Sequence, residues 1–190
     1  MKSLTIGVLA LQGCVLPHKF HIEGHGACFK EVRAKEDLDG IDGLILPGGE
    51  SSSMLKLIRE FSLEEDLKAA FARMPVWGVC AGAILLAKQV ESPRQWSFAL
   101  CDITIERNAY GRQLDSFNAT IDNYPVAFIR APIIRSVGQD VETHALFKEH
   151  PVWVKSDTVM ITTFHPELYQ ERPSSFHLEF IQLIHQFYKR

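Results

Sequence analysis

The sequence has no long apolar run, no surplus of basic residues and no paired cysteines. No stretch approaches the roughly 20 apolar residues that a membrane-spanning helix needs, which argues against a membrane protein. The 190 residues include 20 lysines and arginines against 23 aspartates and glutamates, so nucleic-acid binding through bulk positive charge is disfavoured. The four cysteines are scattered without a C-x-x-C pair, so they carry no zinc signature, and we expect no bound metal.

Targeting signals are missing as well. The apolar run at 4–11 is short and no small-residue cleavage site follows it, so a buried first strand explains it better than a signal peptide. Scattered cysteines are typical of reduced thiols. We therefore expect a cytoplasmic protein.

Short apolar runs alternate with amphipathic stretches in the first half of the chain. Length and 46% hydrophobic content predict one domain, residues 1–190, around one core. The alternation predicts an α/β domain with a mostly parallel central sheet and helices on both faces. The expected strands are 5–11, 27–32, 44–46, 75–80, 103–107, 117–121, 126–130 and 159–163. The expected helices are 16–23, 51–61, 63–73, 81–88 and 175–188, with Ser51, Ser52 and Ser53 supplying the N-cap of the second.

The pattern G-x-C-x-G at 78–82 lies where an expected strand meets an expected helix. In hydrolases such a pattern forms a tight, strained turn that exposes a nucleophile and needs small neighbours two residues away on each side. Cys80 is therefore the candidate nucleophile, and the N–H of Ala81 is placed to donate to a developing oxyanion. The alternative is a buried structural cysteine beside two packing glycines.

His165 and Glu167 follow the last expected strand, separated by a proline. A cysteine that attacks an amide needs a group that can protonate the departing amine, and histidine has a suitable pKa. A carboxylate bonded to the far ring nitrogen would fix the tautomer and stabilise the imidazolium. In isolation this motif would be read as a loop histidine beside a surface glutamate, but together with the G-x-C-x-G pattern it indicates a triad.

Gly48 and Gly49 lie between an expected strand and a helix. Adjacent glycines let the backbone approach a ligand closely, and their N–H groups could form the second half of an oxyanion hole. A phosphate site is the rival interpretation, but the spacing is not that of a P-loop, and we expect no cofactor.

The remaining histidines receive a structural interpretation. His18, His21 and His25 could share one helix face and suggest a metal patch, but no acidic or cysteine partner completes it. The others are expected to be surface or packing residues: His144, His150, His177 and His185.

These motifs carry a resemblance to a known family. The segments 46–51, 78–82 and 164–167 together resemble a class I (triad) glutamine amidotransferase. Within that superfamily, the chain resembles the glutaminase subunit of glutamine-dependent pyridoxal 5′-phosphate synthase over nearly its whole length. The segments that carry this closer resemblance are A-L-Q-G at 10–13, E-R-N-A-Y-G-R-Q at 106–113, D-S-F at 115–117 and F-I-R-A-P at 128–132.

The resemblance implies a flavodoxin-like fold and a set of roles. Cys80 would attack the carboxamide of L-glutamine, His165 would protonate ammonia and then activate water, and Glu167 would orient His165. The family's oxyanion and glutamine sites correspond here to Gly48, Gly49, Glu50, Ser51, Ala81, Arg107, Ile129 and Arg130. Two arginines and a carboxylate also suit an α-carboxylate and an α-ammonium group on physical grounds.

The resemblance also implies a partner. Ammonia released into water becomes non-nucleophilic ammonium, so the subunit would pass it through a shielded path to a (β/α)8-barrel pyridoxal 5′-phosphate synthase. Two stretches differ from the family's usual pattern. Cys14–Phe20 brings a proline and more bulk near the expected docking face, and Glu91–Leu100 lacks the usual glycine-rich lead-in.

Three alternatives stay open. An amidotransferase subunit could serve another synthase, such as one of histidine or purine biosynthesis, although the segment 106–113 argues against it. A cysteine redox sensor or small-molecule hydrolase of related fold would undergo oxidation of Cys80 without glutamine-dependent acylation. A non-catalytic interaction subunit is disfavoured by the intact triad.

Overall fold

The computed structural model describes residues 3–107 and 116–189. Most of the segment 106–113 and Asp115, which carry part of the resemblance, therefore lie outside the described residues. A seven-stranded sheet forms the centre, in the order β10-β11-β12-β4-β3-β1-β2. Its strands are β1 (Thr5–Leu9), β2 (Cys28–Val32), β3 (Gly43–Leu46), β4 (Val76–Val79), β10 (Glu142–Phe147), β11 (His150–Lys155) and β12 (Val159–Thr162).

Five of these strands are parallel, and β10 and β11 extend one edge in antiparallel fashion. The central parallel strands β3, β4 and β12 are almost entirely apolar because both faces of the sheet are covered there. Side chains alternate between two cores: Leu44 and Leu46 join one, and Ile45 between them joins the other.

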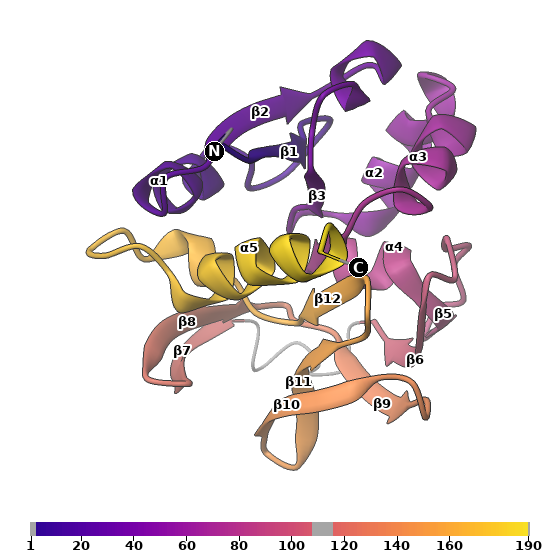
Figure 1. Cartoon of the computed structure of the whole chain (residues 1–190). Helices are drawn as coiled ribbons and strands as arrows, with labels where there is room; N and C mark the ends of the chain where they lie inside the picture. Colours follow the sequence, from indigo (N-terminus) through magenta and orange to yellow (C-terminus); the bar gives the residue numbers. More distant parts are fainter. Residues whose placement is uncertain (1–2, 108–115, 190) are drawn as a thin grey trace.

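Helices cover both faces of the sheet, as predicted (Figure 1). One face carries α2 (Ser51–Glu60), α3 (Glu64–Phe71) and α4 (Ala81–Leu86). The other carries α1 (Pro17–Gly24) and α5 (Ser175–Phe187). In Figure 1, α1 and α5 lie together on one side, although about 150 residues separate them in the sequence.

Smaller elements flank this layered core. A three-stranded sheet in the order β5-β6-β9 consists of β5 (Ala87–Glu91), β6 (Cys101–Glu106) and β9 (Ile133–Val137). A hairpin joins β7 (Ser116–Ile121) to β8 (Tyr124–Ile129). Two 3-10 helices, η1 (Lys35–Leu38) and η2 (Pro166–Leu168), complete the described elements.

The structure corrects three expectations. The helix after Cys80 ends at Leu86, because Ala87 already pairs with Cys101 as the start of β5. The N-cap of α2 is Glu50 and not a serine, since its carboxylate accepts hydrogen bonds from the N–H groups of Ser52 and Ser53. The strands β5, β9, β10 and β11 were not expected at all.

No helix in the described part of the chain combines the length and the apolar character that crossing a membrane requires.

Candidate active site

Cys80 lies at the turn between β4 and α4, with φ 49° and ψ −98°, angles that a non-glycine residue rarely adopts. Its N–H donates to the carbonyl of Thr162 at 2.8 Å, which ties the turn to β12. A Cβ atom at Gly82 would lie 2.0 Å from the carbonyl oxygen of Leu46, and one at Gly78 would lie 2.8 Å from the nitrogen of Ala83. The strained turn with small neighbours is the geometry predicted from the G-x-C-x-G pattern.

His165 and Glu167 form a buried pair behind the thiol. The Nδ1 atom of His165 lies 2.7 Å from Oε1 of Glu167, and the Glu167 side chain is completely buried. The backbone of His165 exchanges two hydrogen bonds with Ala127 of β8, at 2.7 and 3.2 Å. The imidazole is therefore fixed by its backbone and by its far ring nitrogen.

The electrostatics of the pair favour its charged form. Burial opposes a charge on the His165 ring, but the Glu167 carboxylate and the thiols of Cys14 and Cys80 outweigh it, so the pKa of His165 is raised. Burial also opposes the charge on Glu167, yet the adjacent imidazole holds the pKa of that carboxyl below its usual value. The site is thus built to stabilise an imidazolium.

The Gly48–Gly49 turn packs against the same imidazole. A Cβ atom at Gly48 would lie 2.1 Å from Cε1 of His165, and one at Gly49 would lie 2.5 Å from Oε1 of Gln12. The carbonyl of Gly48 accepts a hydrogen bond from the N–H of Cys14 at 2.9 Å. Because the peptide is planar and trans, the N–H of Gly49 points away from Cys14.

A cavity of about 290 Å³ opens in front of the thiol. It gathers most of the residues predicted from the sequence. These are Gly49, Glu50, Ser51, Cys80, Ala81, Arg107, Ile129, Arg130 and His165. Gly48 and Glu167 lie behind this layer, against and beyond the imidazole.

Glu50 and Arg107 meet at one wall of the cavity, with Nη2 of Arg107 3.3 Å from Oε1 of Glu50. Burial opposes the charge of Glu50, but hydrogen bonds from Ser52 and Ser53 lower the pKa of the carboxyl to about 2. Glu50 is therefore ionised at any working pH. The carbonyl oxygen of Ile129, another residue of the cavity lining, lies 3.8 Å from Sγ of Cys80.

Four lining residues were not among the predicted site residues: Gln12, Gly13, Cys14 and Ile84. Oε1 of Gln12 accepts a hydrogen bond from the N–H of Glu50 at 3.0 Å and so supports the cap of α2. Sγ of Cys14 belongs to a group of three potential ligand atoms, with His165 and Glu167, that lie within 4.8 Å of one another. Gln12 and Gly13 belong to the A-L-Q-G segment that carries part of the family resemblance, whereas the only sequence signal of Cys14 was its position after the first expected strand.

One face of α1 and its C-cap carries three histidines, as the sequence suggested: His18, His21 and His25. This face contacts η2, α5 and the segment between them. His21 binds backbone groups of Glu167 and Ser174, His18 lies 2.9 Å from His177, and His25 binds the carbonyl of Ser174. The hydrogen-bond partners of these three imidazoles are thus groups of the protein itself.

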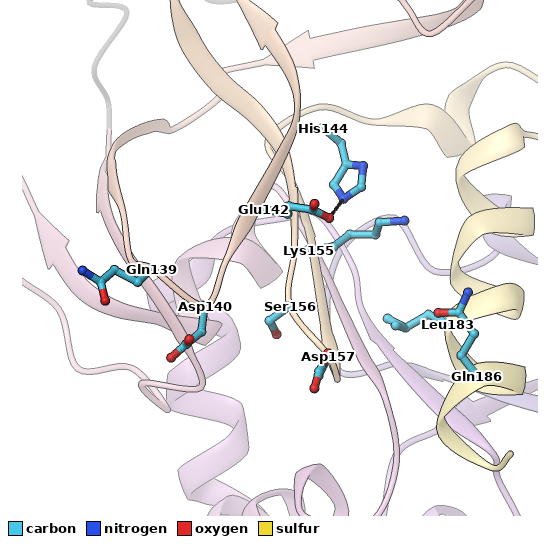
Figure 2. A pocket seen from close by; sticks show the side chains of 9 residues that line it. All are labelled: Gln139, Asp140, Glu142, His144, Lys155, Ser156, Asp157, Leu183 and Gln186. Carbon is cyan, nitrogen blue, oxygen red and sulfur yellow. Dashed lines mark ion pairs between the residues drawn. The ribbon is translucent and has the colours of Figure 1, made fainter. Parts of the chain in front are cut away.

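A larger cavity, about 690 Å³, lies away from this site, between the β10–β11 hairpin and α5 (Figure 2). Figure 2 shows Glu142 and His144 pointing toward one another, and Nε2 of His144 lies 3.3 Å from Oε2 of Glu142. Among the described residues that line this cavity there is no cysteine. It therefore lacks the combination of a thiol at a strained turn and a histidine–glutamate pair that marks the smaller cavity. The larger of the two cavities is therefore not the candidate active site.

The fold, together with a thiol at a strained strand-to-helix turn beside a buried histidine–glutamate pair, defines a class I (triad) glutamine amidotransferase. The chain belongs to the SNO glutamine amidotransferase family, which it matches over residues 8–186. This agrees with the family resemblance found in the sequence.

Individual relatives agree with this assignment. The chain is 46% identical over 175 residues to a protein of Solibacter usitatus named pyridoxal 5′-phosphate synthase subunit PdxT, covering 86% of this chain and 91% of that protein. It is 39% identical to the PdxT subunit of Fervidobacterium nodosum, covering 98% of this chain and all of that protein.

Solved structures show the same fold. A crystal structure of a glutamine amidotransferase matches with a TM-score of 0.86 and 39% identity, covering 95% of this chain and 98% of that one. The structure of PurLQS from Thermotoga maritima matches with a TM-score of 0.62 over 99% of this chain and all of that one, but at 17% identity it supports the fold alone.

Proposed function

We propose that this chain is the glutaminase subunit of a pyridoxal 5′-phosphate synthase, and that Cys80, His165 and Glu167 carry out the hydrolysis of L-glutamine to glutamate and ammonia. The observation that carries this proposal is the convergence of three segments in one cavity. A strained nucleophile turn, a buried histidine–glutamate pair and a glycine turn packed on the imidazole all come together there.

The first half-reaction forms a thioester. The thiol of Cys80 gives its proton to His165, and the resulting thiolate attacks the side-chain carbonyl carbon of glutamine, whose carbonyl oxygen takes up negative charge. The N–H groups of Ala81 and Gly49 are the donors for this oxyanion. The C–N bond then breaks, and the imidazolium of His165 gives its proton to the departing nitrogen, which leaves as ammonia.

The second half-reaction regenerates the thiol. His165, now neutral, takes a proton from water, the hydroxide attacks the thioester, and glutamate leaves as the C–S bond breaks. Glu167 remains ionised throughout and stabilises each imidazolium that forms. Its burial strengthens this interaction because little water screens it.

Substrate recognition is assigned to the charged wall of the cavity. The ionised Glu50 suits the α-ammonium group of glutamine, while Arg107 and Arg130 suit its α-carboxylate. Ser51 and Ile129 complete the lining beside the thiol. A substrate carrying both charges on one carbon is thereby held with its side chain directed at Cys80.

The ammonia needs a protected destination, since protonation in bulk water would remove its nucleophilicity. We assign as the partner a synthase subunit, in a hetero-oligomer, because the relatives reported above are named as subunits of pyridoxal 5′-phosphate synthase. The (β/α)8-barrel form of that partner is what the family resemblance implies. A cytoplasmic location follows from the requirement that the Cys80 thiol stays reduced in order to act.

The test is glutamate release from L-glutamine with and without the cognate synthase. Cys80→Ala should lower the rate by about 10⁴-fold. The other thiol that lines the cavity, that of Cys14, does not lie at the strand-to-helix turn and is not expected to replace the nucleophile. Cys28→Ala is the control, because that thiol is exposed and away from the cavity. Turnover that survives Cys80→Ala would overturn the proposal.

A further inference from the structure

Four buried or half-buried histidines lie behind the triad: His18, His21, His25 and His177. The mechanism above uses none of them. His18 and His21 on α1 and His177 on α5 are at most 1% exposed. The rings of His21 and His177 stack with their centroids 4.5 Å apart. This cluster fills the space between α1, α5 and the segment that carries Glu167.

His21 joins two backbone groups of that segment. Its Nδ1 accepts a hydrogen bond from the N–H of Ser174 at 3.0 Å, and its Nε2 lies 3.1 Å from the carbonyl oxygen of Glu167. A backbone N–H can only donate and a carbonyl can only accept. The proton of the ring must therefore be on Nε2, and both ring nitrogens are satisfied only in the neutral imidazole.

Neighbouring contacts reinforce this attachment. His25 lies with Nε2 2.8 Å from the carbonyl oxygen of Ser174, so α1 holds both polar groups of the same residue. Ser174 is in turn the N-cap of α5, where its hydroxyl accepts from the N–H of Phe176. The segment between η2 and α5 is thus fixed at both of its ends by helix α1.

The carboxylate of Glu167 depends on this backbone support. Its Oε1 holds His165, but its Oε2 is buried and has no hydrogen-bond partner among the described residues. Because this carboxylate is held through one oxygen, a shift of its backbone would carry Oε1 out of line with Nδ1 of His165. The ring of His21 constrains that backbone directly, by the hydrogen bond from its Nε2 to the Glu167 carbonyl.

We propose that His21 is a positioning residue of the glutaminase centre, which holds the Glu167 backbone so that Oε1 stays in line with Nδ1 of His165. This inference rests on the proposed function. It predicts that the bond to Glu167 matters for turnover, while the bond to Ser174 matters mainly for folding. Since His21 touches neither substrate nor thiol, its loss should lower kcat and leave KM for glutamine nearly unchanged.

Two conservative substitutions separate the two bonds. In His21→Gln the amide nitrogen takes about the position of the ring Nε2 and can still donate to the Glu167 carbonyl. In His21→Asn the amide oxygen takes about the position of Nδ1 and can still accept from Ser174, but the donor to Glu167 is lost. His21→Ala removes both bonds, and His185→Ala is a control at an exposed position of α5.

The experiment measures kcat and KM for glutamate release by the full chain with its cognate synthase, together with the thermal midpoint of each variant. His21→Ala should lower kcat by about 10- to 100-fold with KM within about 2-fold, as expected when a reacting group moves by a fraction of an ångström. His21→Gln should recover kcat to within about 3-fold of wild type, whereas His21→Asn should resemble His21→Ala.

A second measurement needs no partner. Alkylation of Cys80 by iodoacetamide, followed on its own peptide by mass spectrometry, should slow in His21→Asn and not in His21→Gln. Equal kcat in the Gln and Asn variants, or losses that only follow the thermal midpoint, would overturn the inference. If wild type releases no glutamate, or Cys80→Ala still does, the proposed function itself has failed, and that outcome is distinct.

Discussion

Gly48 packs against the His165 ring. An alanine there would place its Cβ 2.1 Å from Cε1 of the imidazole, so either the ring or the glycine turn must move. Because a displacement of about 1 Å at a reacting group costs on the order of 100-fold in rate, we expect Gly48→Ala to lower kcat for glutamine by at least that factor. Steady-state glutamate release measures it.

A matched control separates this clash from a general effect of losing a glycine. Gly26 has φ 79° and no atom within 4 Å of its missing Cβ, so Gly26→Ala should cost about 1 kcal/mol in stability and leave kcat unchanged. Full activity in Gly48→Ala would show that the turn can retreat from the ring.

Cys14 interacts with the same ring from another side. Its thiol is one of the groups that raise the pKa of His165. Cys14→Ala removes that interaction, so the pKa of His165 should fall relative to wild type. NMR titration of the His165 ring in both proteins measures the difference. A pKa that is unchanged or higher in the variant would contradict this prediction.

At the scale of elements, helix α2 begins at a residue that also serves the cavity. The carboxylate of Glu50 caps the helix and pairs with Arg107. In Glu50→Gln the amide has one acceptor and no charge, so both interactions weaken. If the proposed ammonium contact exists, its loss should raise KM for glutamine by about 10- to 100-fold, with a smaller change in kcat.

Glu60→Gln at the exposed end of the same helix should leave KM as in wild type. Thermal midpoints of both variants separate the capping role from the binding role. A KM that does not rise in Glu50→Gln would assign the carboxylate to the helix cap alone.

The elements that the sequence predicted are those with strong local signals. Buried parallel strands such as β3 and β4 are continuous apolar runs, and the amphipathic helices α2 and α5 show clear periodicity. The missed hairpin β10–β11 turns at Lys148 and Glu149, both with positive φ. Such turns usually contain asparagine or glycine, so this pair gave no local turn signal.

At the scale of the whole molecule, the site depends on contacts that span the chain. The thiol and the imidazole could be predicted because each sits in a recognisable local motif at the end of a strand. His21 and His177 could not, since 156 positions separate them and neither has a local motif. Their burial follows from the packing of α1 against α5, which only the assembled sheet brings about.

That packing makes the stability of the whole molecule sensitive to acid. Burial, partly offset by the Glu167 carboxylate and reinforced by His21 and His165, lowers the pKa of His18 to about 4, against 6.5 for the ordinary group. Burial also lowers the pKa of His21 and His177. The unfolded chain therefore binds more protons than the folded chain at pH values between about 4 and 6.5.

This contribution of the neutral histidines to stability is complete above about pH 6.5 and is lost as the pH falls toward 4. For His18 the shift corresponds to about 3 kcal/mol. Denaturant unfolding between pH 4.5 and 8 measures it.

His18→Leu should be less stable than wild type at pH 8, because Nε2 of His177 loses its partner, but its stability should fall less steeply with acid. His185→Leu, at an exposed position, should keep the wild-type slope. Parallel pH profiles for wild type and His18→Leu would mean that protonation of this cluster does not limit acid stability.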